Sequence, residues 1–212
     1  ARARAGGVLP GRVHTYCLNY IEEACKYKAT YVYVLKPRLE SLFNEVIYPP
    51  LCFSKADAEL WEEDPNEFVR RSFDFVADFF SPRTAAQRLL ATLAEKRAKD
   101  CLHGFVLACS AVLQRTQQAT DEASLMQKDG ALLAIGSLQK QLMKKEQYAA
   151  SIEPMLRLHV LPTLASPAGF LRQRACWVYS EFTPAVFNGK KKSHGSPAME
   201  QITQVFPRLV EL

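Results

Sequence analysis

The strongest constraint on the fold is an internal repeat. A basic residue is followed three positions later by alanine, and large apolar residues lie four and seven positions beyond that alanine. The three copies are Arg83, Ala86, Leu90 and Leu93; Lys128, Ala131, Ile135 and Leu138; and Arg172, Ala175, Tyr179 and Phe182. Successive alanines are 45 and 44 residues apart. One copy could arise in any amphipathic helix, but three copies at nearly constant spacing indicate a structural repeat.

This period lies in the range of HEAT and armadillo units, which contain two or three helices each. The small alanine would let neighbouring helices approach closely, and the two larger residues would fill the layer between repeats. We expect the basic residue at the helix start, at the solvent edge. Because such a unit cannot bury its apolar face alone, it needs neighbours. The predicted fold is all-α, a HEAT/armadillo-type α-solenoid that forms a right-handed superhelix of helical hairpins.

A weaker fourth copy, with cysteine in place of alanine, consists of His14, Cys17, Ile21 and Ala24. Cys17 lies 69 residues before Ala86, which is more than one period. An acidic insertion near 54–67, about half a repeat long, would account for the excess.

The predicted organisation follows from this repeat and from the composition of the ends. Residues 1–11 are expected to form a flexible N-terminal segment, and the chain lacks an initiator methionine, as a piece of a longer protein would. The HEAT-repeat solenoid is predicted over 12–187. A basic loop over 188–197 and a further helix over 198–212 complete the chain.

Local signals support helices throughout. In Asp64-Pro65-Asn66-Glu67 an N-cap precedes a proline at the first helical position, and Glu67 is placed to close a capping box. The apolar stripe after it is Val69, Phe73, Val76 and Phe80. Ser81-Pro82 and Ser166-Pro167 are further start signals. Tyr31–Leu35 is strand-like in composition, but it is short and stands alone, so helix is preferred there.

Charge and cysteine usage limit the class of protein. The net charge is +5, but the basic residues are scattered, and the tight run Lys190–Lys192 falls in the predicted loop. The positive net charge is therefore compatible with either nucleic acid or an acidic partner. The longest uncharged stretches, 101–114 and 158–171, have 14 residues each and are too short to span a bilayer, so no membrane partner is expected. Six cysteines without a C-x-x-C pair indicate reduced thiols in the cytosol or nucleus.

No catalytic constellation is apparent. The chain has no H-E-x-x-H, G-x-S-x-G, Walker or G-x-G-x-x-G motif, and Lys128-Asp129-Gly130 lacks the glycines of a phosphate loop. We therefore expect no enzyme, no cofactor and no metal site. An enzyme that uses a Cys–His nucleophile pair is a minor alternative, although some Cys–His pairs are expected by chance.

The densest polar feature is an acidic stretch with a tryptophan inside it. Its residues are Asp57, Glu59, Trp61, Glu62, Glu63, Asp64 and Glu67. Carboxylates around an exposed aromatic ring would suit a basic protein partner. The alternative, slightly favoured, is a solvated helix whose Trp61 docks into the core. We therefore treat these residues as a candidate site for a basic protein partner.

Several blocks, in order and at constant spacing, resemble one known family. They are Leu18-Asn19-Tyr20-Ile21, Phe43-Asn44-Glu45-Val46-Ile47, Leu60-Trp61-Glu62-Glu63-Asp64-Pro65, Glu67-Phe68-Val69-Arg70, Ser81-Pro82 with Ala85-Ala86-Gln87, Lys128-Asp129-Gly130-Ala131-Leu132, Ile135-Gly136-Ser137-Leu138, and Arg172 with Arg174-Ala175-Cys176-Trp177-Val178. These blocks resemble the importin-beta (karyopherin-beta) family, and most closely its importin seven and eight branch. The resemblance covers roughly 12–187.

The resemblance implies an interior fragment of a large receptor made of stacked HEAT repeats. Such a receptor would carry protein cargo, here expected to be basic, through the nuclear pore, and it would shuttle between cytoplasm and nucleus. The GTPase Ran would control release, and pore proteins would be further partners. No Ran-binding residue is assigned to this chain. The alternative is a HEAT-repeat scaffold that binds RNA or ribonucleoprotein, which the charge of +5 motivates; direct nucleic-acid binding is the less favoured of the two.

Overall fold

The computed structural model describes residues 11–73 and 81–187, and within these two ranges no β-strand occurs. The all-α prediction is confirmed there. Of the predicted flexible segment 1–11, only Gly11 is described, and it is helical. The predicted loop 188–197, the helix over 198–212, and Val76 and Phe80 lie outside the described residues.

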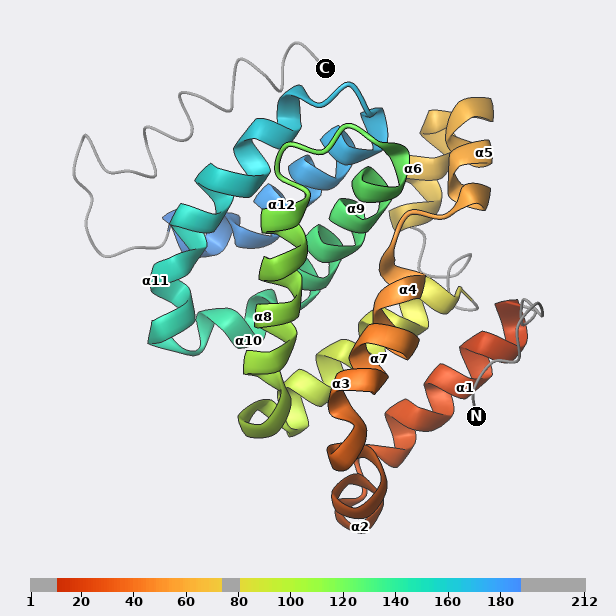
Figure 1. Cartoon of the computed structure of the whole chain (residues 1–212), viewed down its shortest axis with the longest axis vertical. Helices are drawn as coiled ribbons and strands as arrows, with labels where there is room; N and C mark the ends of the chain where they lie inside the picture. The colour runs from red at the N-terminus through yellow and green to blue at the C-terminus, as the bar shows by residue number, and fades with distance from the viewer. Residues whose placement is uncertain (1–10, 74–80, 188–212) are drawn as a thin grey trace.

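The helices follow one another with short connections (Figure 1). The first hairpin comprises α1 (Gly11–Ala24) and a long run made of α2 (Lys28–Thr30), η1 (Tyr31–Leu35), η2 (Lys36–Arg38), α3 (Leu39–Ser41), η3 (Leu42–Ile47) and α4 (Tyr48–Leu51). Next come α5 (Lys55–Glu63) and α6 (Pro65–Phe73). The remaining elements are α7 (Pro82–Lys96), α8 (Ala98–Arg115), α9 (Glu122–Ser137), α10 (Gln139–Met143), α11 (Glu146–Met155), η4 (Leu156–Val160), η5 (Leu161–Ala165) and α12 (Gly169–Phe187).

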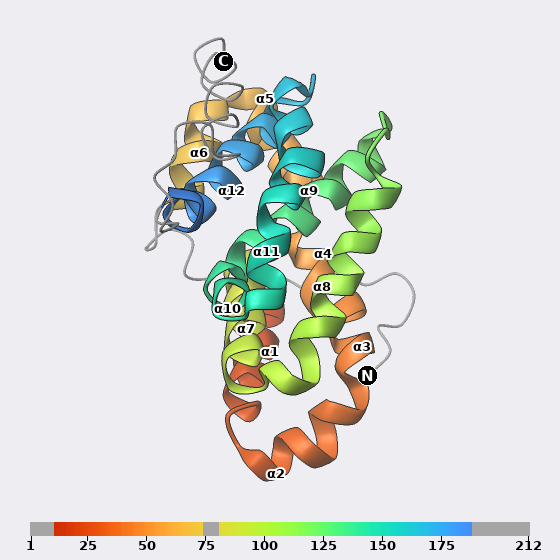
Figure 2. The same cartoon turned by 90° about the vertical axis from the view of Figure 1, so that its left-hand side faces the viewer.

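The core lies between successive helical units. Helix α1 packs against α7, α7 against α9, and α9 against α12, so that helices one repeat apart are neighbours. The second helices of the units add to the same core: α8 packs against both α7 and α9, and Phe43 of η3 stacks on Phe105 of α8 with ring centroids 4.8 Å apart. The stack is visible from two directions (Figures 1 and 2).

The repeat residues occupy the positions that the pattern predicts. Ala86, Ala131 and Ala175 each have no exposed surface, and they lie on α7, α9 and α12, three helices in successive contact. The larger residues of the three copies are also buried, apart from the half-buried Tyr179. The three alanines therefore mark the layer in which neighbouring repeats meet.

Two details of the repeat prediction are wrong. Lys128 does not lie at a helix start at the solvent edge; it lies within α9, and it is buried. In the weak fourth copy, Cys17 is exposed whereas Leu18 is fully buried. Because α1 turns Leu18 towards α7, the fourth copy is displaced by one residue and Cys17 does not replace the alanine.

Prolines coincide with widened helical turns. The run Tyr31–Leu35 is a π-helix that precedes Pro37, which confirms helix in place of the strand-like alternative. The π-turn of η3 precedes Pro49 in the same way, and that of η4 precedes Pro162. Proline lacks an N–H group and its ring clashes with the carbonyl four residues earlier, so a wider turn lets the helix continue.

The helix starts agree with the sequence signals, with one correction. Ser81 Oγ accepts a hydrogen bond from Arg83 N at 3.2 Å where α7 begins, and Asp64 Oδ1 accepts one from Glu67 N at 3.0 Å where α6 begins. The predicted capping box is only half formed, because the Glu67 carboxylate binds arginines instead of the Asp64 backbone. A complete box is found one helix earlier, at Ser54 and Asp57.

Enlarging an alanine of the inter-repeat layer is expected to destabilise the chain. Replacing Ala131 or Ala175 by phenylalanine should lower the free energy of unfolding by about 1–3 kcal/mol, because the layer has no room for a ring. The matched control is Ala150→Phe on α11, where the side chain is exposed. Urea denaturation measures all three. Equal stability of Ala131→Phe and Ala150→Phe would contradict the packing described here.

Candidate functional site

An aromatic cluster attaches α5 and α6 to the far end of the stack. Phe53 stacks on Phe170 of α12 with ring centroids 3.8 Å apart, and it meets Phe68 of α6 edge-on at 5.5 Å. Trp61 of α5 meets Phe68 edge-on at 5.3 Å. The residues on α5 and α6 thus contact α12, which lies about a hundred positions further along the chain, beyond α7 and α9 in sequence. The α5–α6 pair lies beside the start of α12 (Figure 1).

Trp61 packs directly against the start of α12. A Cβ atom at Gly169 would lie 2.6 Å from Trp61 Cζ2, so only glycine allows the indole to approach this closely. Trp61 is half-buried and is neither a free contact residue nor a fully enclosed one. Its main role in this structure is to hold α5 in place, which agrees with the favoured sequence interpretation.

The seven candidate acidic-stretch residues do not form one surface. Asp57 faces inward, and its Oδ2 lies 2.6 Å from Arg83 Nη2 of α7. Glu67 binds the guanidinium groups of Arg70 and Arg71, each at 2.7 Å, and these hydrogen bonds lower the pKa of its carboxyl to about 2. Both residues are therefore already engaged within the chain.

The remaining carboxylates of the stretch face solvent. Glu59, Glu62 and Glu63 of α5 are exposed, and none of them has an ion-pair partner among the described residues. Asp64 is exposed too, but its Oδ1 caps α6. The outward-facing patch, called the α5 acidic face below, therefore consists of Glu59, Glu62 and Glu63.

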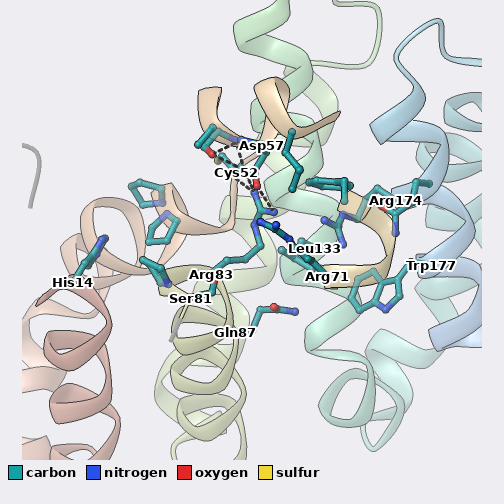
Figure 3. A pocket seen from close by; sticks show the side chains of 18 residues that line it. His14, Cys52, Asp57, Arg71, Ser81, Arg83, Gln87, Leu133, Arg174 and Trp177 are labelled. Atoms are coloured by element: carbon teal, nitrogen blue, oxygen red, sulfur yellow. Dashed lines mark hydrogen bonds and ion pairs between the residues drawn. The ribbon is translucent and has the colours of Figure 1, made fainter. Parts of the chain in front are cut away.

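Behind the α5 acidic face lies a groove of about 660 Å³ that sequence reasoning did not identify. It opens between the α5–α6 pair and the helices α7, α9 and α12 (Figure 3). Its polar walls include Asp57, Arg71, Arg83, Arg174 and Trp177. The sequence carried no signal for it, because its walls come from positions far apart in the chain.

One wall of the groove depends on a buried ion pair between repeats. Arg174 Nε of α12 donates to Asp129 Oδ1 of α9 at 2.8 Å, and the two side chains are 6% and 1% exposed. The guanidinium also lies over the ring of Trp177, 5.3 Å from its centroid. Arg174 is consequently held rigidly by two elements at once.

The buried and half-buried cysteines have the character of structural thiols. They are all free, and burial raises the pKa of Cys52 to about 11 and the pKa values of Cys101 and Cys109 to about 12. Such thiols stay protonated at neutral pH and are poor nucleophiles. Within 11–73 and 81–187 no cluster of three potential metal ligands is found.

None of the described helices is both long enough and apolar enough to cross a bilayer.

Comparisons with known proteins agree with the repeat pattern. The Cse1 family profile matches residues 15–160. The chain is 38% identical over 186 residues to the importin beta-like SAD2 homolog of Arabidopsis thaliana, which covers 87% of this chain and 18% of that protein. It is also 38% identical to importin-8 of Homo sapiens over 179 residues (84% and 17%) and to the probable importin-7 homolog of Dictyostelium discoideum over 178 residues (83% and 17%). No solved structure matches.

The fold and these matches define an α-solenoid of the HEAT-repeat class. The chain belongs to the Cse1/importin-beta family. It spans less than a fifth of the length of the curated relatives that it matches.

Truncating the anchor of α5 is expected to loosen the α5–α6 pair. Replacing Trp61 by alanine should cost about 2–3 kcal/mol, less than for a fully buried tryptophan, because the ring is half-buried. Hydrogen exchange should show faster exchange in α5 and α6, with the amides of α7 and α9 unchanged. Unaltered exchange in α5 and α6 would show that the indole does not hold them.

Removing one partner of the buried Asp129–Arg174 ion pair should lower the free energy of unfolding more than replacing both partners. Asp129→Ala leaves the Arg174 charge buried without its partner and should destabilise by about 3–5 kcal/mol. The double variant Asp129→Ala, Arg174→Met should recover part of that loss. Chemical denaturation of the single and double variants measures the difference, and a double variant less stable than Asp129→Ala would contradict this account.

Proposed function

We propose that this chain is part of a nuclear import receptor that binds protein cargo and carries it through the nuclear pore under the control of Ran. The observation that carries the proposal is 38% identity to proteins named importins over more than four fifths of the chain, with the repeat residues buried between successive helices. Ran and nuclear pore proteins would be engaged by the wider receptor, which would shuttle between cytoplasm and nucleus. The stacked repeats supply the mechanism: many small interfaces let such an arc change curvature around a partner.

Within this receptor, we propose that the α5 acidic face contacts basic cargo. Its three carboxylates are exposed and lie on one helix that the aromatic cluster holds against α12. A rigidly presented group of like charges attracts an oppositely charged partner at long range. Of the other candidate residues, Asp57, Asp64 and Glu67 have intramolecular roles, and Trp61 serves as the anchor.

A pull-down tests the receptor function as a whole. The full-length protein should retain proteins from cell extract, and GTP-loaded Ran should release them. A bound set that does not change when GTP-loaded Ran is added would count against Ran-controlled cargo transport.

Reversing the α5 acidic face should weaken the binding of basic cargo. The variant Glu59→Lys, Glu62→Lys, Glu63→Lys is preferred to one that includes Asp64, because Asp64 caps α6 and its loss would cost roughly 1 kcal/mol of stability. The effect should lie mainly in the association rate and should shrink as salt increases, because exposed charges act through long-range steering. Stopped-flow or surface-based kinetics with a lysine-rich peptide measure it.

The matched control changes the same amount of charge elsewhere. Glu23, Glu45 and Glu95 are exposed glutamates on or beside other helices, and their triple reversal to lysine gives the same net charge as the test variant. The two variants should differ in association rate although their total charges are equal. Equal slowing in both would show that net charge alone matters and would reject the α5 acidic face as a site.

A further inference from the structure

We propose that the groove behind α5 binds a carboxylate side chain carried by an otherwise basic cargo segment. This inference deepens the proposed function and rests on it for the nature of the partner. The groove would take the acidic residue, and the α5 acidic face would take lysines or arginines on the same segment. Recognition of cargo would then require a mixed-charge pattern and not merely positive charge.

The arginine side chains of the groove are arranged for carboxylate binding. Arg174 is fixed at one nitrogen by Asp129 and at its face by Trp177, and no hydrogen bond within the described residues engages its two terminal nitrogens. Arg71, whose side chain is 57% exposed, binds Glu67 through Nε at 2.7 Å, and no hydrogen bond within the described residues engages its terminal nitrogens. A guanidinium whose orientation is already fixed loses little freedom when it binds a carboxylate through its remaining N–H groups.

The three arginines come from three different elements around one opening. Arg71 belongs to α6, Arg83 to α7 and Arg174 to α12, and all three line the groove together with a single carboxylate, that of Asp57 (Figure 3). Asp57 is already bound to Arg83. Arg71 and Arg174 are also paired, with Glu67 and Asp129, but each through Nε alone, so their terminal N–H groups are left for an anionic oxygen group.

The surroundings favour a single carboxylate over a polyanion. A nucleic acid presents a phosphate at every nucleotide and is bound by a track of cations. Here the groove is bordered by α5, whose outer side carries Glu59, Glu62 and Glu63. These charges would repel the next phosphates of a nucleic acid but would attract lysines next to a glutamate.

A short extended peptide is long enough to reach from the groove, across α5, to the acidic face. Helix α5 separates the groove from the acidic face, since Ala56, Asp57 and Leu60 line the groove while Glu59, Glu62 and Glu63 face solvent. A helix is about 10 Å across, and an extended chain advances about 3.3 Å per residue. Lysines roughly three residues from the glutamate would therefore reach the acidic face.

The test is a double-mutant cycle between the groove and a designed probe. The probe is a labelled, lysine-rich peptide with one central glutamate, and its twin has glutamine at that position. The full-length protein should bind the glutamate peptide about tenfold more tightly, the effect of one charged hydrogen bond. Arg71→Gln should abolish this preference, as measured by fluorescence anisotropy at constant salt.

A neighbouring arginine provides the matched control. Arg70 also binds Glu67 and is also on α6, but it does not line the groove. Arg70→Gln removes the same charge and should keep the tenfold preference. Arg174→Lys, which retains the charge beside Asp129 but loses the planar fork, should reduce the preference without unfolding the protein.

The outcomes separate this inference from the proposed function. Equal affinity for the two peptides in the unmodified protein would overturn the groove site, and the acidic face would still stand if its triple reversal weakened both. The groove site would also be overturned if Arg70→Gln and Arg71→Gln lost the preference for the glutamate peptide equally. It would likewise be overturned if neither peptide bound. Displacement of the glutamate peptide by a uridine oligonucleotide, dependent on Arg71, would assign the groove to nucleic acid instead.

Discussion

The structure depends on close contact between helices one repeat apart. A helical hairpin of this size buries too little apolar surface by itself, and the apolar side of each unit is covered only when the next unit stacks on it. Ala86, Ala131 and Ala175 make that approach possible because they bring no side chain beyond Cβ into the layer. The buried Asp129–Arg174 pair crosses the same layer. These two buried, oppositely charged side chains fix the register of one repeat on the next, since neither can slide away without losing its partner.

The α5–α6 pair makes use of this rigid stack. Phe53, Trp61 and Phe68 join it to the start of α12, and the Asp57–Arg83 pair joins it to α7. A short helical pair tied at two places across several repeats limits how those repeats can flex relative to one another. It also encloses the groove, whose polar walls are the arginines of the helices it spans. The opposite charges of its outer and inner sides result from this placement.

Much of the fold could be predicted because its determinants are local. The alanine spacing located three of the packed helices, and the Ser81-Pro82 and Asp64-Pro65 signals located the starts of α7 and α6, since capping depends on residues only two or three positions apart. The errors concern residues whose environment is set by distant ones. Lys128 was placed at a solvent edge, but α9 extends further towards its N-terminus than the repeat pattern suggested, and the lysine is enclosed. Glu67 suited a capping box by spacing, but two nearby arginines compete for its carboxylate.

The amino-acid sequence by itself determined the helical class, the period of the repeat, the family and the presence of an unusual acidic stretch. Each of these depends on which residue types occur at fixed spacings along the chain. It did not determine which acidic residues face outward. Asp57 and Glu59 are both carboxylates and lie two positions apart in the same acidic stretch, yet Asp57 pairs with Arg83 whereas Glu59 is exposed. Only the tertiary structure decided this division, and only it brought Arg71, Arg83 and Arg174 around one groove. The physical reason is that the direction of a side chain on the α5–α6 pair depends on where that pair docks, and its docking contacts lie on α7 and on α12, a helix about a hundred residues away.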